Sequence, residues 1–437
     1  MVEAIHREAA ALLLSAIYRD PSPDGIISSF FYGKPGSPMW DRRIGTEICY
    51  RRREMVRAVL CIRQNGPAYL KYLSINNISR MLQEFVRENF WHLRETLFKH
   101  FSCSYAEYLA EETKLVFADA LASSAIFTPV NELTLFPLVP VRVDADFVST
   151  PFFLISPESL TPQLGYPDAE RWIEPEPFPP LKEWEGKTET PSAWLGVRSP
   201  AVQSSEKMRS AVLGAIALTP LPGYRHQFSM RTMFGGRCTI GGGTTISSGS
   251  AHTPPMAEDI VVTEMDHAWL SLLATKLLSS EKRVRRELRA LEYFYRAWPL
   301  DESERFPVLC MVLDAVFGDA NEATQAVING VRGTIGEHVS EPRLRLLMEI
   351  RASVIHGGAP DVYDSRKYAR YYDRYGEDPI FDLGLVVARC LRRRIFDDAL
   401  VEHPDPNARL IADLQAKGRL PKGLGTRPTI LTEGQRP

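Results

Sequence analysis

The stretch EPRLRLLMEIRASVIHGG, residues 341–358, is the strongest indication of the structure of the C-terminal part of the chain. Its apolar residues recur at intervals of three and four, which predicts an amphipathic helix. Pro342 suits a first helical turn, and Gly357 and Gly358 end the helix directly after His356. Stretches with the same spacing recur between residues 265 and 396. Together they predict an all-helical domain of about six helices over residues 257–402, followed by a tail over residues 403–437.

The rest of the chain predicts a mixed helical and β-containing region, so the expected fold class is α+β. We expect residues 1–125 to be mainly helical, because apolar residues between 77 and 122 follow helical spacing with an interruption near Ser102. Residues 126–256 predict a β-containing, loop-rich region. Within it, residues 132–155 are rich in Val, Phe, Leu and Thr with embedded prolines, which favours short strands, some of them at a sheet edge.

Two other segments of this middle region show less regular spacing of apolar residues. Residues 157–202 hold many Pro, Glu and Trp residues without a period, which predicts long irregular connections. The glycine-rich run MFGGRCTIGGGTTISSGS, residues 233–250, lacks the Gly-Lys-Ser/Thr that a phosphate loop requires. It therefore predicts a flexible hairpin or a loop.

Composition indicates a folded protein without a dominant charge. The chain has 437 residues, of which 44% are hydrophobic and 24% are charged. Such proportions are typical of globular domains and exclude a disordered or collagen-like chain. The formal net charge is -2, which provides no general attraction for nucleic acid. A site for a polyanion would therefore require a local basic patch.

The sequence predicts neither a metal site nor a membrane segment. Its six cysteines are scattered without a CxxC pair, which favours reduced thiols, and no zinc-ligand spacing is present. We therefore expect no cofactor. Glu3 and Glu8 precede the N-terminal apolar run and no small-residue cleavage site follows it, which predicts an amphipathic helix rather than a signal peptide. Because no apolar stretch is long enough to span a bilayer, we expect a cytoplasmic protein.

Arg351 and His356 form an Arg-x4-His pair at the C-terminal end of the helix predicted over residues 341–358. The pattern alone is weak evidence, because Arg87 and His92 match it too. That second pair lies inside a predicted helix, whereas His356 lies in a final turn. Unpaired carbonyl groups of a final turn favour the protonated imidazole, which suits acid–base chemistry near neutral pH.

Helix geometry adds a condition on this pair. Five positions along an ideal helix rotate the side-chain direction by about 140°, so Arg351 and His356 cannot face one target from one regular helix. Either the helix end is distorted or two copies of the chain cooperate in a two-fold dimer. Ser353 lies on the His356 side and is small enough to let a partner or a phosphate approach. Asp314, set in an apolar stretch, is either a hydrogen-bonded core residue or a support for the site.

These features resemble the HEPN superfamily, specifically its Apea-like branch. One sign is the apolar helix that ends in Arg351, His356 and two glycines. A second is the preceding stretch VLCMVLDAVFG, residues 308–318, with Asp314 at the acidic position. The stretch VVTEMDHAWLSLLATKLL, residues 261–278, which leads into these helices, also fits this branch. The resemblance covers about residues 257–402.

The resemblance implies a metal-independent endoribonuclease that acts as a homodimer. The RNA's own 2′-hydroxyl would attack the neighbouring phosphate while His356 moves protons and Arg351 stabilises the negative charge of the phosphorane. Relatives of this kind commonly serve prokaryotic defence against phage or stress. The N-terminal region would then sense a signal or restrain the nuclease, and a trigger protein or ligand would release the activity.

Basic residues after the helix predicted over residues 341–358 predict a path for RNA. The candidate substrates include tRNA. Arg366, Lys367, Arg370 and Arg374 alternate with tyrosines in SRKYARYYDRYG, residues 365–376. Interleaved basic and aromatic residues are typical of single-stranded nucleic-acid binding, although a solvated, tyrosine-rich lid loop fits equally. Residues 282–289 (KRVRRELR) and 392–394 (RRR) are solvated helix faces that could also hold phosphate.

Two alternatives to a nuclease remain open. A non-catalytic HEPN module would use the same helices to dimerise and to bind RNA or a protein, with Arg351 and His356 serving only as packing or ligand contacts. An unrelated enzyme centred on the middle region lacks a supporting motif, because no GxSxG elbow, HExxH pair or Walker loop is present.

Overall fold

The computed structural model describes residues 3–33, 44–164, 191–220, 229–231, 233–241, 243–319, 322–355, 357–359, 361–404, 408–419 and 429–432. The chain divides into two compact units. Unit 1 comprises Met1–Glu132 and Ser199–Ser204, and unit 2 comprises Leu133–Arg198 and Ser205–Pro437. Most of the region predicted over residues 126–256 thus belongs to the same unit as the C-terminal helices, because the two share one hydrophobic core.

Unit 1 combines helices with a small antiparallel sheet. Its helices are α1 (Ala4–Ser15), α2 (Arg52–Asn65), η2 (Ala68–Tyr72), α3 (Ile75–Asn89), η3 (Phe90–Thr96), α4 (Tyr105–Tyr108) and α5 (Glu111–Ala122). Its strands β1 (Ile17–Tyr18), β2 (Gly25–Tyr32) and β3 (Ile44–Arg51) pair in the order β1-β3-β2. The helices predicted between residues 77 and 122 are confirmed. The expectation of mainly helical structure missed the β2–β3 hairpin, although the Ile and Phe residues of β2 favour a strand.

Unit 2 is built on a six-stranded sheet with the strand order β10-β9-β4-β8-β7-β6. In chain order these strands are β4 (Glu132–Leu138), β6 (Phe147–Val148), β7 (Phe152–Ile155), β8 (Ala193–Ser199), β9 (Gly235–Ile240) and β10 (Thr244–Gly249). A separate parallel pair joins β5 (Val141–Val143) to β11 (Ile260–Val262). The strands predicted over residues 132–155 are confirmed, and the glycine-rich run forms the antiparallel β9–β10 hairpin.

The prediction of irregular connections over residues 157–202 is wrong at both ends of that segment. The short helix α6 (Leu160–Leu164) lies near its beginning, and β8 lies near its end as a buried strand inside the sheet. Residues 165–190, which hold most of the Pro and Glu residues, lie outside the described residues. The buried strand escaped prediction because AWLGVRS has no alternation of polar and apolar residues.

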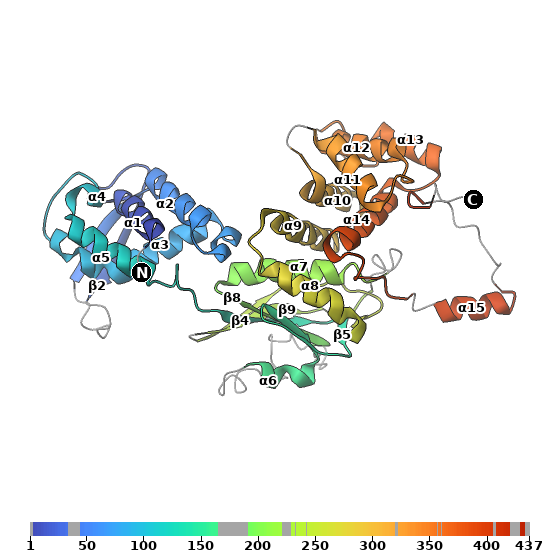
Figure 1. Cartoon of the computed structure of the whole chain (residues 1–437), viewed down its shortest axis with the longest axis horizontal. Helices are drawn as coiled ribbons and strands as arrows, with labels where there is room; N and C mark the ends of the chain where they lie inside the picture. The colour runs from blue at the N-terminus through green and yellow to red at the C-terminus, as the bar shows by residue number, and fades with distance from the viewer. Residues whose placement is uncertain are drawn as a thin grey trace. The chain divides into compact units, whose positions relative to one another are not determined.

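Alternate side chains of the sheet enter two different cores. Phe152 and Leu154 of β7 belong to the main core, whereas Phe153 and Ile155 belong to a smaller cluster with Leu160 of α6. This alternation follows the period of two of a β-strand. The helices α7 (Val202–Ile216) and α8 (His267–Leu277) cover one face of the sheet, and α6 lies on the other face (Figure 1).

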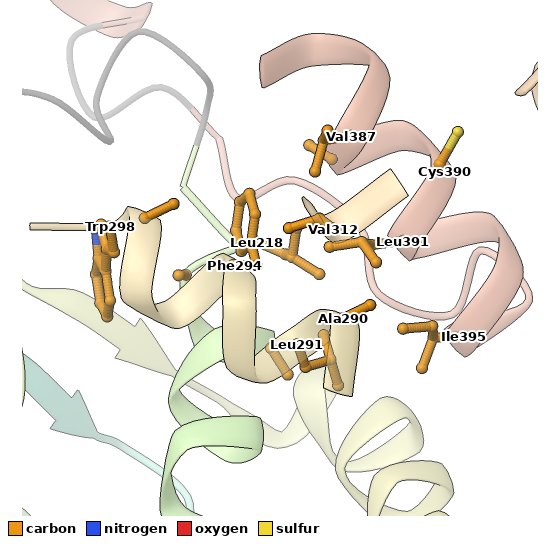
Figure 2. Close-up of a cluster of buried hydrophobic side chains, with 14 of the residues drawn as sticks. Leu218, Ala290, Leu291, Phe294, Trp298, Val312, Val387, Cys390, Leu391 and Ile395 are labelled. Carbon is orange, nitrogen blue, oxygen red and sulfur yellow. The ribbon is translucent and has the colours of Figure 1, made fainter. Parts of the chain in front are cut away.

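A helical bundle completes unit 2. It consists of α9 (Lys282–Ala297), α10 (Glu302–Phe317), α11 (Ala323–Ile335), α12 (Glu341–Ile355), α13 (Arg366–Tyr375) and α14 (Pro379–Phe396), and α15 (Ala408–Ala416) follows in the chain. Figure 2 shows Leu291 of α9, Val312 of α10 and Leu391 of α14 converging in its core. At Gly214, α7 lies so close to α9 that a Cβ atom would stand 2.2 Å from the carbonyl oxygen of Leu291.

The six helices predicted between residues 265 and 396 are confirmed, and the fold class is α+β with a helical C-terminal part. Residues 366–375 form helix α13, so the alternative of a tyrosine-rich lid loop is wrong for this segment. Ser365 caps its first turn and Gly376 ends it with a φ of 66°. Within the described ranges, no helix has the length and apolarity needed to cross a membrane.

Candidate active site

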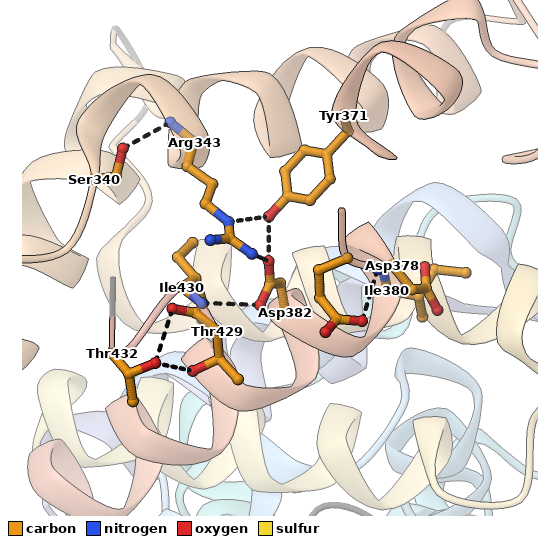
Figure 3. Close-up of polar contacts among 10 residues, drawn as sticks. Ser340, Arg343, Tyr371, Asp378, Ile380, Asp382, Thr429, Ile430 and Thr432 are labelled. Carbon is orange, nitrogen blue, oxygen red and sulfur yellow. Dashed lines mark hydrogen bonds and ion pairs between the residues drawn. The ribbon is translucent and has the colours of Figure 1, made fainter. Parts of the chain in front are cut away.

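A buried polar network fixes α12 within unit 2. Arg343 of α12 forms an ion pair with Asp382 of α14 and donates from Nε to the hydroxyl oxygen of Tyr371 at 3.0 Å (Figure 3). Tyr371, on α13, donates to the same carboxylate at 2.5 Å. None of the three side chains is more than 1% exposed. Because an unpaired charge would be costly at this depth, the network fixes the positions of α12, α13 and α14 relative to one another.

The network also holds a C-terminal segment. The second carboxylate oxygen of Asp382 accepts a hydrogen bond from the backbone N–H of Ile430 at 3.0 Å, and the Ile430 side chain is fully buried (Figure 3). Burial raises the pKa of the Asp382 carboxyl, and the hydrogen bond from Tyr371 and the charge of Arg343 oppose this shift. Residues 429–432 are thereby attached to the bundle that carries the candidate site.

The candidate site centres on a contact between α12 and α10. Nη2 of Arg351 lies 2.6 Å from Oδ2 of Asp314. The side chains are 21% and 28% exposed, so the pair is partly shielded from water but accessible from one side. Burial raises the pKa of the Asp314 carboxyl, and the positive charge of Arg351 opposes this shift. The structure thus places Asp314 beside the predicted catalytic arginine. This position fits the interpretation of Asp314 as a support for the site.

The Arg351–Asp314 pair leaves two polar atoms without partners among the described residues. Nε of Arg351 and Oδ1 of Asp314 are both buried. Among the described residues, Nε finds no acceptor and Oδ1 finds no donor. A buried polar group without a partner costs free energy, so such atoms are concentrated where a ligand or a further side chain completes the site. The guanidinium therefore has an unused N–H donor beside its bond to the carboxylate.

The end of α12 has the predicted form. The backbone N–H of Gly357 donates to the carbonyl oxygen of Val354 at 3.2 Å, and its φ of 72° is one that glycine adopts without strain. The N–H of Ala359 donates to the carbonyl oxygen of Ser353 at 3.1 Å. His356 lies outside the described residues, so its predicted place in the final turn stays a prediction.

Ser353 does not take part in the Arg351–Asp314 contact. Its hydroxyl group donates to the carbonyl oxygen of Glu349 at 3.1 Å, within its own helix. The side chain is half-buried. To donate to a phosphate oxygen, the Ser353 hydroxyl would have to give up this hydrogen bond.

The basic residues predicted to bind RNA lie on α13 and divide into two groups. Arg366, Arg370 and Arg374 are exposed and follow one another at intervals of four residues, so they line one face of the helix. Lys367 is half-buried and its Nζ donates to the carbonyl oxygen of Glu349 at 3.3 Å. The three arginines are thus placed to meet a ligand, whereas Lys367 attaches α13 to α12.

The tyrosines of α13 mostly serve the interior. Tyr371 is buried in the network of Arg343, and Tyr368 donates to Asp378 at 3.2 Å. Tyr372 is 51% exposed and remains available at the surface. The interleaved pattern of the sequence therefore separates into an inner aromatic side and an outer basic side.

The competing Arg-x4-His match has a different environment. Arg87 forms an ion pair with Glu84 at the surface of unit 1. Burial lowers the pKa of His92, which lies in η3 rather than at the end of an α-helix. This pair has the surroundings of ordinary structural residues, as its position within a predicted helical region indicated.

Sequence reasoning underrated the basic residues of α9. Lys282, Arg285, Arg286 and Arg289 were interpreted mainly as a solvated helix face, but they line a hollow of about 530 Å³ that Asp314 also borders. Their spacing of three and four residues was the available signal, since it places them on one face. What the sequence lacks is the packing of α9 against α10, which forms the other wall.

Comparisons of the chain with protein-family models, with curated proteins and with solved structures found no match. Among the described residues, no group of three or more His, Cys, Asp or Glu side chains has the arrangement of a metal site.

Proposed function

We propose that the chain is a HEPN-type endoribonuclease that cleaves RNA without a metal ion. In this proposal the 2′-hydroxyl of the RNA attacks the adjacent phosphorus, a pentavalent phosphorane forms, and the 5′-oxygen of the next nucleotide leaves. The products are a 2′,3′-cyclic phosphate and a 5′-hydroxyl end. The Arg351–Asp314 pair also fits the alternative of a non-catalytic module.

The observation that carries the proposal is the Arg351–Asp314 pair. A carboxylate that accepts from one Nη of a guanidinium orients its plane and leaves the remaining N–H groups for a second anion. The unpartnered Nε of Arg351 is such a donor. We infer that Asp314 positions Arg351 and that Arg351 donates to a phosphate oxygen as negative charge develops.

His356 supplies the proton transfers in this proposal. It follows Ile355, the last residue of α12, where helix carbonyl groups favour a protonated imidazole. The imidazole takes the proton from the 2′-hydroxyl or donates one to the leaving 5′-oxygen, and one histidine from each copy of a dimer would cover both tasks. Ile355 is 47% exposed at the helix end, which provides an apolar contact for a second copy.

The test is cleavage of labelled tRNA and total RNA by the purified full chain in EDTA. We expect cleavage by the wild type, and losses of about a hundredfold or more in Arg351→Ala and His356→Ala with unchanged folding. Sedimentation at micromolar concentration tests the dimer. Trigger candidates, including phage lysates and nucleotides, are added in parallel arms, because activity in this class commonly needs release. Full activity in both variants would exclude this site.

The non-catalytic alternative draws on the same ion pair. A guanidinium bound to a partly buried carboxylate also serves as a clamp between α10 and α12. In that case Arg351→Ala would lower stability, and RNA binding without cleavage would be observed under every condition. The matched variant Arg351→Lys separates the two, because lysine keeps the ion pair but not the planar fork.

A further inference from the structure

The hollow between α9 and α10, hereafter the α9 hollow, is a basic recess directly beside the candidate site. It has a volume of about 530 Å³, and its basic wall consists of Lys282, Arg285, Arg286 and Arg289. Asp314, the partner of Arg351, borders the same recess. A ligand in the α9 hollow therefore lies next to the Arg351–Asp314 pair.

The positive charges of the α9 hollow are largely uncompensated. Of its four cations, Arg289 is paired with Glu292 at 2.8 Å, which leaves three without a carboxylate partner among the described residues. Arg286 donates to the backbone carbonyl oxygens of Ala315 at 2.8 Å and Gly318 at 2.7 Å, so its charge is not neutralised. Such an excess is notable in a chain whose net charge is -2.

One of these cations also has an unused donor. Nε of Arg285 is buried and has no hydrogen-bond partner among the described residues. A buried guanidinium N–H without an acceptor is destabilising, and an anionic oxygen in the hollow would remove that cost. The single negative side chain of the recess, Asp314, is already bound to Arg351.

The spacing of the cations fits a chain of charges better than a single small anion. Lys282 and Arg289 are seven residues apart on α9, which corresponds to about 10 Å along the helix axis. Met311 of α10 is 38% exposed and borders the same hollow, where it offers an apolar contact for a ribose or a base. A row of positive charges beside an apolar surface is the arrangement that single-stranded nucleic acid requires.

We propose that the α9 hollow binds the phosphodiester backbone of single-stranded RNA and directs the strand toward Arg351. The assignment rests on the proposed function only in naming RNA as the ligand and Arg351 as the reacting site. An acidic protein segment is the competing occupant. RNA is favoured because Asp314, the partner of Arg351, borders the recess, so a strand that lies along α9 passes beside the Arg351–Asp314 pair.

The test measures binding without cleavage. A fluorescein-labelled, fully 2′-O-methylated single strand cannot be cut by 2′-hydroxyl attack, so its binding is independent of the nuclease activity. Anisotropy is recorded for the full chain between about 50 and 200 mM KCl, because each lost phosphate contact on a single strand lowers the slope of log K against log salt by about 0.7. The double variant Lys282→Gln/Arg285→Gln is expected to bind roughly tenfold more weakly with a slope smaller by about 1.4.

The matched control is Arg52→Gln/Arg53→Gln, which removes two exposed charges from α2 of unit 1. It should bind like the wild type, and thermal melting should confirm that both double variants fold. Equal affinity and slope in the α9 variant and the wild type would overturn the proposal. So would competition by poly-glutamate as efficient as that by unlabelled RNA, which would indicate a protein ligand. If the methylated strand binds through the α9 hollow and unmodified RNA stays intact in every trigger arm, the nuclease fails while the assignment of the α9 hollow as an RNA-binding site stands.

Discussion

Nη2 of Arg351 donates to Oδ2 of Asp314 at 2.6 Å, and this contact joins residues that are 37 positions apart in the chain. It connects the end of α12 to the last turn of α10. The pair is partly exposed, so its contribution to stability is about 1 kcal/mol or less. Its main consequence is positional, because the carboxylate orients the guanidinium that the proposed reaction uses.

Asp314→Asn should therefore reduce RNA cleavage more than it reduces stability. We expect a decrease in kcat of about tenfold to a hundredfold with little change in KM, since misplacing a catalytic group by about 1 Å has such an effect. The measurement is steady-state cleavage of a defined RNA together with urea unfolding. Glu206→Gln is the matched control, because Glu206 of α7 forms a 2.6 Å ion pair with Arg237 of β9, and both side chains are partly exposed. Equal losses of activity in both variants would contradict a positional role for Asp314.

The network of Arg343 makes a prediction about stability. Arg343→Met leaves the carboxylate of Asp382 buried without its cation, which should lower the free energy of unfolding by about 3–5 kcal/mol. Arg389→Met, on the same helix as Asp382, removes an ion pair whose two side chains are 42% and 40% exposed. It should cost less than about 1 kcal/mol. Denaturant unfolding of the two variants measures the contrast, and similar midpoints would show that the buried network does not stabilise the bundle.

His252 should make unit 2 less stable in acid. Its Nε2–H donates to the carbonyl oxygen of Gly236 at 2.6 Å, and Nδ1 accepts from Arg209 at 3.1 Å, so the buried imidazole is neutral. Burial lowers its pKa to about 3, with the charges of Arg209 and Arg237 acting in the same direction and the hydrogen bond to Gly236 acting against them.

The direction of this pH dependence follows from the lowered pKa of the His252 imidazole, which is a base. The unfolded chain takes up a proton on His252 below about pH 6.5, whereas the folded protein does so only near pH 3. The contribution of the neutral imidazole to the free energy of unfolding is therefore fully present above about pH 6.5. Between about pH 6.5 and pH 3 this contribution falls by about 1.4 kcal/mol per pH unit as the pH decreases. Urea unfolding at several pH values should show a shallower dependence in His252→Gln than in the wild type. Parallel curves for the two proteins would mean that this imidazole is protonated in the folded state.

The contact between α7 and α9 depends on glycine. In Gly214→Ala the new Cβ would lie 2.2 Å from the carbonyl oxygen of Leu291, so one of the two helix backbones must shift. We expect a loss of about 1–3 kcal/mol in the free energy of unfolding. Gly333→Ala on α11 meets no atom within 4 Å and should be neutral or stabilising by up to about 1 kcal/mol. Thermal melting of both variants checks the difference, and a stable Gly214→Ala protein would disprove the close approach.

Much of the bundle could be predicted because its helices are amphipathic and end at recognisable residues. Gly318 follows α10 and Gly357 follows α12, as their sequence positions indicated. Helix α7 escaped prediction for the opposite reason. Its stretch AVLGAIAL is apolar on every side, since α7 lies between the sheet and α9, and so it has no polar face to mark its period.

The candidate site could be predicted only in part. Arg351 and Asp314 were both recognisable, but their contact depends on how α10 packs against α12, which no local pattern contains. The α9 hollow likewise needs α9 and α10 side by side. The tyrosines of α13 show the reverse error, because Tyr371 looked like a nucleic-acid contact and instead lies buried against Arg343.

The most direct test of the account is the chemistry of the RNA ends. A labelled single-stranded RNA and its 2′-O-methylated counterpart are incubated in EDTA with the wild type, Arg351→Ala and His356→Ala, with the trigger arms described above. We expect that only the wild type cuts, that only the unmodified strand is cut, and that the products carry 2′,3′-cyclic phosphate and 5′-hydroxyl ends. Cleavage that leaves 5′-phosphate ends, or cutting of the methylated strand, would contradict it.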